Sequence, residues 1–514
     1  MDKRDIDSMS EKELQKLIIQ EKINGVSDAE LGKKYGINYK YIENIITKTQ
    51  GLNISNLNVS KKVKSLQPKL FHEEQTSVWS FKQRGNWATH SGEYRGNWSP
   101  YIPRNIILKY SDPGDLVLDY FCGSGTTAIE CKLLGRKCIA LDINDQAIEL
   151  TKTNLNFSVD EQGSLFGQET GVQIYEPQVM VGDARDLSVL PENSIDLICA
   201  HPPYANIIHY TESNINDLSS LGFDDFLAEM AKVAKESFRV LKPGKKCTIL
   251  IGDSRKQKHV IPLGFKLIQV YLEAGFKLKE LIIKRQYNCK TTGFWYSNSI
   301  KHNFLLLSHE YLPIFEKPAE NSPEYIMEEI ATYGIVSPYS KNIKLEGTPK
   351  EFETTTVWIF PNKDYDNLLY KNVIERYAPE KKYSIIEFKT SLENIISLNL
   401  AENLELIYIK PFFLNENSTI GQVNQYLHSL SNFVNQVLLQ LNNLRYIVIQ
   451  TSDVRIDDYL EPLAKDITDL LQADQLWLKE IIILTQETNQ EYQKSDNKLT
   501  IVHQYLLVYE VRYA

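Results

Sequence analysis

The sequence predicts an α/β protein with a Rossmann-like parallel sheet, a helical segment before that sheet and a second α/β region after it. First, short apolar segments typical of strands alternate with helical patterns from residue 105 onward. Second, the strand 116–119 runs directly into a turn with two glycines that opens a helix. Third, five segments of the first half recur in the same order in the second half, which indicates two related domains.

The composition is that of a soluble protein with more than one domain. A chain of 514 residues is too long for one hydrophobic core. It has no apolar run long enough to span a bilayer and no signal-peptide pattern, so we expect no membrane span and a cytoplasmic location. Its six cysteines lack metal-binding spacing, which fits a reducing compartment and predicts no metal site. The net charge is −9, so any nucleic-acid contact must come from local basic patches.

Residues 1–55 predict a small helical segment that resembles a helix-turn-helix. Ser27 and Glu30 have the spacing of a capping box, Gly36 interrupts the helical pattern, and a second helix is expected from about Tyr39. The expected core of this segment is Leu14, Leu17, Ile18, Leu31, Tyr35, Ile37, Ile42, Ile45 and Ile46. The residues expected to face DNA are Tyr39, Lys40, Asn44 and Lys48. The alternative is a helical arm that only packs on the main domain. Residues 56–74 are interpreted as a linker with a basic cluster.

Residues 75–315 are expected to form the main α/β domain. Its predicted strands lie at 116–121, 137–143, 178–184, 195–201, 246–253 and 279–286. In open α/β sheets, ligands bind outside the carboxyl ends of the strands. The residues that end these strands are therefore the first candidates for a functional site.

The glycine turn after the strand at 116–121 is the first half of the candidate site. Gly123 and Gly125 allow a tight turn and a close approach to a ligand, and a helix is expected from about Thr126. Asp142 ends the next strand, where an acidic residue suits a ribose diol. Asp183 follows the third strand, where it would meet an adenine amino group.

This turn resembles the S-adenosylmethionine loop of class I methyltransferases. A dinucleotide fingerprint requires a third glycine, where this chain has Ala128. The pattern Asp119-x-Phe-x-Gly-x-Gly is instead that of the methyltransferase loop, which implies that Phe121 covers the methionine part and that the backbone of 123–126 cradles it. The cofactor-binding residues expected on this basis are Asp119, Phe121, Cys122, Gly123, Gly125, Thr126, Asp142 and Asp183. The alternative is an ordinary strand–helix turn.

The second half of the candidate site is His201-Pro202-Pro203-Tyr204, which follows the fourth strand. The two prolines fix two φ angles and remove two donors, which leaves carbonyl oxygens as acceptors. A side chain at position 201 and the Pro202 carbonyl group can accept both hydrogen bonds of an exocyclic amino group, which frees its lone pair to attack a methyl donor. Tyr204 would stack on a base turned out of the duplex.

Together these motifs resemble the DNA methylases that modify exocyclic amino groups, whose motif is Asp, Asn or Ser followed by Pro-Pro-Tyr or Pro-Pro-Phe. The resemblance covers about residues 75–312, including a segment at 89–110 of the kind that closes the methionine pocket. It implies S-adenosylmethionine as the cofactor, double-stranded DNA with a flipped base as the substrate, and adenine N6 or cytosine N4 as the target.

His201 departs from that motif at its most critical position. A neutral imidazole nitrogen accepts a hydrogen bond, whereas an imidazolium cannot. We therefore expect activity to collapse below about pH 6 to 6.5. The alternative is that His201 only packs and that the Pro202 carbonyl group acts alone.

A basic and aromatic stretch at 277–303 is the expected DNA surface. Its candidates for phosphate and base contacts are Lys284, Arg285, Lys290, Phe294, Trp295 and Tyr296. We expect TGFWYS, residues 292–297, to be a hairpin loop between two strands. The alternative is a strand pair with a solvated basic face and a tip buried against the second repeat. A second candidate for DNA contact is Arg95, Asn97 and Trp98, which can also be interpreted as a cofactor lid.

The internal repeat predicts that residues 351–514, after a linker at 316–350, form a degenerate methyltransferase-like domain. The matched segments are 105–121 with 372–388, 75–81 with 354–360, 197–204 with 406–413, 275–284 with 475–484, and 299–310 with 500–511. In the second repeat both glycines are lost, and Lys410 stands where the first has His201. Such a domain would complete the substrate groove or select the sequence. The alternative is an unrelated α/β domain.

The expected function is site-specific DNA methylation in restriction-modification or phage defence, with cleavage left to a separate restriction nuclease. Two other classes stay open. One is an RNA amino-methyltransferase, and the other is a DNA-binding regulator without catalysis. The recognition sequence, the target base and the oligomeric state cannot be read from the sequence.

Overall fold

The computed structural model divides into two units, each described here by itself. Unit 1 comprises Met1–Phe71 and Arg84–Val240, and unit 2 comprises His72–Gln83 and Leu241–Ala514. The described residues are 14–18, 21, 26, 28–37, 63, 65–92, 94, 96–157, 173–203, 217–287, 292–319, 339–341, 353–388, 403–412, 414–440, 444–487 and 498–513. Within these ranges, no helix combines the length and the apolar character needed to cross a membrane.

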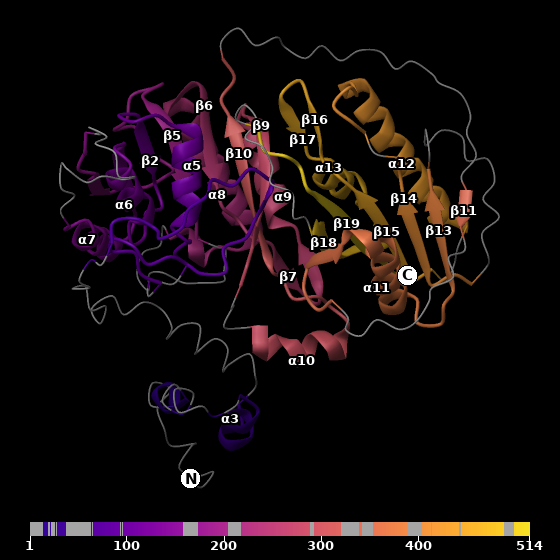
Figure 1. Cartoon of the computed structure of the whole chain (residues 1–514). Helices are drawn as coiled ribbons and strands as arrows, with labels where there is room; N and C mark the ends of the chain where they lie inside the picture. Colours follow the sequence, from indigo (N-terminus) through magenta and orange to yellow (C-terminus); the bar gives the residue numbers. More distant parts are fainter. Residues whose placement is uncertain are drawn as a thin grey trace. The chain divides into compact units, whose positions relative to one another are not determined.

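Unit 1 contains a parallel sheet with the strand order β5-β2-β3-β4. Its strands β2 and β5 are labelled in Figure 1. Its strands are β2 (Leu116–Asp119), β3 (Lys137–Asp142), β4 (Gln178–Val181) and β5 (Ile195–Ala200). Its helices are α5 (Tyr101–Tyr110), α6 (Thr126–Leu133), α7 (Asp145–Asn154), η2 (Leu218–Ser220) and α8 (Phe223–Val240). Each strand begins at the residue expected from the sequence. Every residue of β5 is buried, as in a parallel sheet covered on both faces.

The helical segment before the sheet contains α3 (Asp28–Tyr35). Its small core consists of Ile18, Leu31 and Tyr35, with Leu14, Val26 and Ile37 packed partly against them. Gly36 ends the helix with a φ of 65°, a conformation that glycine adopts without strain. The candidates of the second helix lie outside the described residues, namely Tyr39, Lys40, Ile42, Asn44, Ile45, Ile46 and Lys48.

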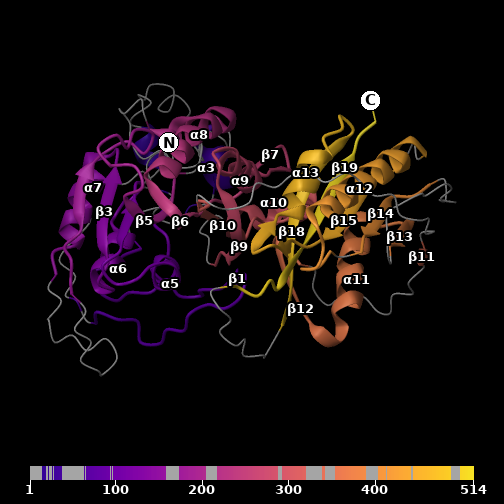
Figure 2. The same cartoon turned by 90° about the horizontal axis from the view of Figure 1, so that it is seen from above.

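Unit 2 contains strands of both sequence repeats in the same order. Four strands follow the order β1-β9-β10-β6, and a seven-stranded sheet follows the order β12-β18-β19-β15-β14-β13-β11 (Figure 2). The former are β1 (Val78–Trp79), β6 (Leu241–Ile249), β9 (Lys277–Arg285) and β10 (His309–Glu316). The latter are β11 (Tyr339–Lys341), β12 (Val357–Pro361), β13 (Tyr383–Glu387), β14 (Leu406–Lys410), β15 (Tyr446–Thr451), β18 (Leu476–Glu487) and β19 (His503–Val511). In both sets the first pairing is parallel and the next two are antiparallel.

Each repeat also has a short hairpin followed by a helix at an equivalent place. The hairpins are β7 (Ser254–Lys256) with β8 (His259–Ile261), and β16 (Val454–Ile456) with β17 (Tyr459–Glu461). The helices of unit 2 are α9 (Leu263–Glu273), α10 (Thr292–His302), η3 (Asn362–Asp364), α11 (Tyr365–Tyr377), α12 (Ile420–Gln440) and α13 (Leu463–Leu470). The two repeats differ in one strand pairing. In the first repeat β3 pairs parallel with β2, whereas in the described part of the second repeat β11 pairs antiparallel with β13.

The prediction of a hairpin loop at 292–297 is wrong, because these residues form the beginning of the helix α10. The strands that flank them do pair antiparallel, with Arg285 opposite His309. The connection between these two residues is much longer than the two to five residues, roughly, of a hairpin loop. It therefore has room for a helix of its own.

The fifth pair of matched segments is also out of register. The sequence aligns 299–310 with 500–511, whereas the structure makes β10 equivalent to β19, so that His309 corresponds to His503. Each histidine ring contacts the tyrosine two residues later, at 3.0 Å for Tyr311 and 2.8 Å for Tyr505. Two leucine-rich segments can be aligned in more than one register, because their residues are alike. The buried contact between histidine and tyrosine fixes a single register.

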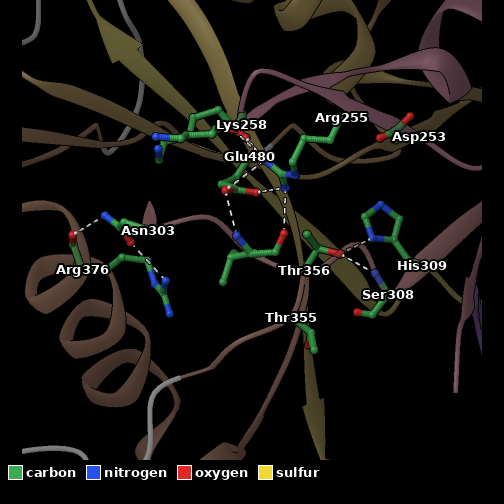
Figure 3. Close-up of polar contacts among 12 residues, drawn as sticks. Asp253, Arg255, Lys258, Asn303, Ser308, His309, Thr355, Thr356, Arg376 and Glu480 are labelled. Carbon is green, nitrogen blue, oxygen red and sulfur yellow. Dashed lines mark hydrogen bonds and ion pairs between the residues drawn. The ribbon is translucent and has the colours of Figure 1, made fainter. Parts of the chain in front are cut away.

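Two buried ion pairs connect the repeats within unit 2. Arg255 of the first repeat donates to Glu480 of the second at 2.6 Å (Figure 3), and Arg455 of the second donates to Glu280 of the first at 2.5 Å. The other oxygen of each carboxylate accepts a backbone N–H, from Leu305 or Leu499. The side chains of Glu480 and Glu280 are at most 2% exposed. The contact is therefore reciprocal, as in an isologous twofold interface.

Replacing Glu480 by glutamine is expected to lower the free energy of unfolding by about 2 kcal/mol. This is less than the roughly 3–5 kcal/mol typical of a broken buried pair, because Arg255 still donates to the carbonyl oxygens of Leu305 and Lys479. Glu280→Gln should cost about the same amount. Chemical denaturation measures both losses, with Glu487→Gln at the exposed end of β18 as a control. A loss confined to one of the two variants would contradict the equivalence of the pairs.

Candidate active site

A cavity lies at the carboxyl ends of all four strands of the unit 1 sheet. Its lining residues are Tyr94, Gly96, Asn97, Trp98, Tyr120, Phe121, Cys122, Gly123, Asp142, Ile143, Asn144, Gly182, Asp183, Ala184, His201, Pro203, Asp217 and Leu218. The cavity therefore brings the glycine turn and the His-Pro-Pro motif together. This placement agrees with the general position of ligands in open α/β sheets.

The turn between β2 and α6 requires glycine at two positions. Gly123 has a φ of 51° and Gly125 a φ of 82°, both in the left-handed region. A Cβ atom on Gly123 would lie 3.0 Å from the Tyr94 ring, and one on Gly125 would lie 2.7 Å from the Thr151 methyl group. Gly123 lines the cavity, whereas Gly125 and Thr126 do not. Those two residues shape the turn instead.

Asp142 is a half-buried carboxylate that lines the cavity. Its oxygens accept the backbone N–H groups of Gly123 and Asn144, each at 2.9 Å. Burial raises the pKa of Asp142 to about 6. Asp119 differs, because it does not line the cavity and accepts the N–H of Phe121 from behind the turn. Burial raises the pKa of Asp119 to about 7.

Asp183 reaches the cavity with its carboxylate already held by Arg185. The guanidinium donates to both carboxylate oxygens, at 2.9 Å and 2.6 Å, and also to Glu229 at 2.8 Å. This network orients the Asp183 side chain at the end of β4.

The His-Pro-Pro-Tyr motif contributes two of its four residues to the cavity in the part of the chain that the structure describes. His201 and Pro203 line the cavity, Pro202 is buried without lining it, and Tyr204 lies outside the described residues. The His201 ring stacks on Trp98, with centroids 5.6 Å apart and planes 21° from parallel. The imidazole plane is thus set by an aromatic partner.

An irregular segment before α5 forms the remaining wall through Tyr94, Gly96, Asn97 and Trp98. The Asn97 amide connects this wall to the glycine turn, because it donates to Ser124 at 2.6 Å and accepts from Thr126. Of the two interpretations of Asn97 and Trp98, their position in the wall favours the cofactor lid. Arg95 lies outside the described residues.

The buried carboxylate of Glu130 in α6 holds the beginning of this irregular segment in place through hydrogen bonds and ion pairs. It accepts from the Trp87 indole at 2.7 Å, contacts the His90 ring at 2.7 Å and pairs with Arg104 at 2.8 Å. Arg84 then donates to the carbonyl oxygens of Asn97 and Trp98. A segment without helix or strand is therefore held by polar contacts.

Sequence reasoning missed several lining residues. Ile143, Asn144 and Ala184 follow strand ends, so the rule that found Asp142 and Asp183 could have found them. Asp217 and Leu218 arrive from a later segment, which carries no motif. Asp217 caps η2 by accepting the N–H of Ser219 at 2.9 Å.

The expected DNA-contacting residues of unit 2 are placed only in part. Lys284 pairs with Glu310 across β9 and β10 at 2.6 Å, so it is engaged in the sheet. Arg285 lies over the Tyr287 ring at 5.0 Å. Lys290 and the side chain of Trp295 lie outside what the structure describes.

The cavity fits S-adenosylmethionine, the cofactor implied by the sequence resemblance. A glycine turn opens a helix there, as suits a closely bound ligand. Asp142 can accept hydroxyl groups of a ribose, and the carboxylates of Asp142, Asp183 and Asp217 suit a ligand that carries a sulfonium charge. Phe121 and Trp98 supply apolar walls.

Cofactor affinity is expected to fall as the pH drops below about 6. Asp142 accepts ribose hydroxyl groups best as a carboxylate, and its raised pKa means that protonation begins well above the usual range of an aspartate. Affinity should therefore be high above that pH and decline below it. Calorimetric titration with S-adenosylmethionine across this range measures the effect. Asp142→Asn should bind weakly with no such dependence, and a flat profile in the unmodified protein would contradict the assignment.

Comparisons with known proteins place the chain in a family. A family model described as DNA methylase matches residues 6–153 and 195–400, and a model for an RMKL-like methyltransferase domain matches residues 107–260. The tRNA (guanine(10)-N2)-dimethyltransferase of Methanothermobacter thermautotrophicus is 34% identical over 112 residues, covering 22% of this chain and 29% of the relative. The Type II methyltransferase M.SmaI of Serratia marcescens is 31% identical over 88 residues, covering 17% and 29%.

The chain thus spans less than a third of the length of these curated relatives. Among solved structures, a putative DNA modification methylase from Thermus thermophilus with bound S-adenosylmethionine is 25% identical, with a TM-score of 0.20, covering 28% of this chain and 55% of that one. Because the DNA methylase model matches more than half of its residues, this chain belongs to the DNA methylase family, whose cofactor is S-adenosylmethionine.

Proposed function

We propose that this chain transfers a methyl group from S-adenosylmethionine to the exocyclic amino group of adenine or cytosine at a specific sequence of double-stranded DNA. The observation that carries the proposal is the shared cavity. The glycine turn after β2 and the residues His201 and Pro203 after β5 line the same hollow. A methyl donor and an acceptor amino group can therefore meet there.

Four groups of this chain would hold the cofactor. The bound cofactor supplies an electrophilic methyl group on its sulfonium. The backbone of 121–123 approaches the ligand closely, because Gly123 has no side chain. Asp142 accepts ribose hydroxyl groups. Asp183, oriented by Arg185, accepts from the adenine amino group. Tyr94 and Trp98 keep water from this side.

The target base would be held by the residues after β5. The neutral His201 imidazole accepts an N–H of the amino group, which favours the pyramidal nitrogen that attacks a methyl group. As the new N–C bond forms, the S–CH3 bond would break with its electron pair left on sulfur, and the imidazole could take the proton that the nitrogen then loses. Trp98 keeps the imidazole ring in one plane by stacking on it. The base must leave the duplex to reach a cavity of this kind, so base flipping belongs to the proposal. Tyr204 would stack on the flipped base.

Methylation of isolated DNA tests this proposal. The purified chain is incubated with radiolabelled S-adenosylmethionine and genomic DNA from a methylation-free bacterial strain. We expect label in DNA, recovered as N6-methyladenine or N4-methylcytosine. The chain is similar to the Type II methyltransferase M1.MboII of Moraxella bovis, with 51% identity over 51 residues covering 10% of this chain and 20% of that relative. A role beside a separate restriction nuclease, or in phage defence, follows if the modified sequence proves to be one that a nuclease cleaves.

RNA is the second candidate substrate, favoured by the tRNA methyltransferase among the relatives. The two substrates are separated by running the assay with duplex DNA and with total RNA in parallel. Label in RNA alone would replace DNA methylation by RNA methylation. Label in neither, together with undetectable binding of S-adenosylmethionine, would contradict both.

A further inference from the structure

A buried polar relay lies in the first repeat within unit 2. The Tyr311 hydroxyl donates to Asp253 at 3.2 Å. The His309 ring contacts the Tyr311 hydroxyl with one nitrogen, and with the other it contacts the Thr356 hydroxyl at 2.8 Å (Figure 3). Thr356 belongs to the second repeat, directly before β12. The relay of one repeat is therefore completed by the other.

The second repeat has the same relay, and here the first repeat supplies the hydroxyl partner of the histidine. Tyr505 donates to Asp453 at 2.9 Å, and His503 contacts the Tyr505 hydroxyl at 2.8 Å. The other His503 nitrogen contacts the hydroxyl of Ser77 at 2.7 Å, and Ser77 belongs to the first repeat, directly before β1. Like the two Arg–Glu pairs, these relays are reciprocal between the repeats.

These relays serve packing, not catalysis. His309, Tyr311, His503 and Tyr505 are at most 3% exposed. Burial lowers the pKa of His309 to about 3, so it stays neutral. A buried, fully paired network of this kind specifies one arrangement of its partners. The second repeat therefore occupies the place that an identical partner takes in a symmetric dimer.

The residues at the carboxyl ends of equivalent strands differ between the two repeats, so the symmetry does not extend to the functional site. At the end of β14, Lys410 stands where the end of β5 leads to His201. The Lys410 ammonium lies 3.7 Å from Asp366 and 5.9 Å from the Tyr370 ring centroid. It is a cation and cannot accept a hydrogen bond from an amino group. The glycines of the turn are absent after β13 as well.

We infer that the chain is an internal pseudo-dimer that modifies only one strand of a non-palindromic target. This rests on the proposed function. Two identical halves related by a twofold axis read sequences with the same symmetry. Here one half keeps the residues for methyl transfer and the other has lost them, so the protein presents different surfaces to the two halves of a site. The recognised sequence is then not its own reverse complement.

The test expresses the full chain in a methylation-free bacterial host and reads modified bases with strand resolution. The control is the same chain with His201→Ala, which should leave no modification. We expect one motif that differs from its reverse complement and carries the modified base on one strand. We also expect light scattering to give the mass of a single chain, 59.3 kDa.

The outcomes separate the inference from the proposed function. A palindromic motif modified on both strands would overturn the inference while leaving methyl transfer intact. A mass twice that of the chain would also overturn it, since a second active centre would restore symmetry. Absence of any modified base, in cells and in the assay on isolated DNA, would overturn the proposed function and the inference with it.

Discussion

Replacing His201 by alanine is expected to lower the rate of methyl transfer by about 100-fold or more, the scale of a lost positioned acid–base group. The imidazole lines the cavity and is held by the Trp98 ring. Without it, one N–H of the target amino group has no acceptor, and the nitrogen stays planar. Cofactor affinity should hardly change, because His201 follows β5 whereas the cofactor groups follow β2, β3 and β4. Single-turnover kinetics with saturating cofactor measures the loss.

His201→Asn is the matched variant. Asparagine is a usual residue of the family motif, and its amide oxygen accepts a hydrogen bond at any pH. This variant should keep most of the activity. It should also lose the acid decline expected of the histidine below about pH 6 to 6.5. Saturating cofactor hides the titration of Asp142 in this comparison. An unchanged acid decline in His201→Asn would assign that decline to another group.

Asp142→Ala is expected to weaken S-adenosylmethionine binding by about 2–4 kcal/mol, which is about 30- to 1000-fold in Kd. The variant loses the carboxylate that would accept ribose hydroxyl groups, and bonds to a charged acceptor are the stronger kind. It also removes the acceptor of the Gly123 and Asn144 N–H groups, which loosens the turn. Equilibrium binding of the labelled cofactor measures the change.

Asp119→Asn serves as the control for Asp142. Asp119 is buried just behind the same turn but does not line the cavity. An asparagine oxygen can still accept the Phe121 N–H. We therefore expect unchanged affinity for the cofactor. If Asp119→Asn weakened binding as much as Asp142→Ala, the effect of Asp142 would be structural, and the ribose assignment would fail.

The candidate site was predictable where it depends on strand ends. Gly123, Asp142, Asp183 and His201 follow four different strands, and the sequence shows that each strand is short and apolar. Parallel strands place their carboxyl ends at one edge of a sheet. Each of the last three residues lies 18 to 41 positions after the one before it, yet all four had to meet, whatever the details of the loops.

The sequence did not predict which side chains of the glycine turn point into the cavity. Asp119 and Thr126 belong to the same motif as Phe121 and Gly123, yet they lie outside the cavity. The motif constrains the backbone path, whereas the side on which a neighbouring side chain emerges depends on local dihedral angles. The wall with Tyr94 and Trp98 was undecided for a similar reason. It has no periodic pattern, and its place depends on Glu130, far away in the chain.

By itself, the sequence determined the fold class, the parallel order of strand and helix, the cofactor turn and the existence of a repeat, because these are local or periodic properties of the chain. Only the tertiary structure decided that residues 292–302 form a helix, that His309 corresponds to His503, and that each repeat completes the other's buried relay. Such contacts join residues far apart in sequence. Buried polar groups must find partners wherever the folded chain supplies them, and no local pattern records which partners those are.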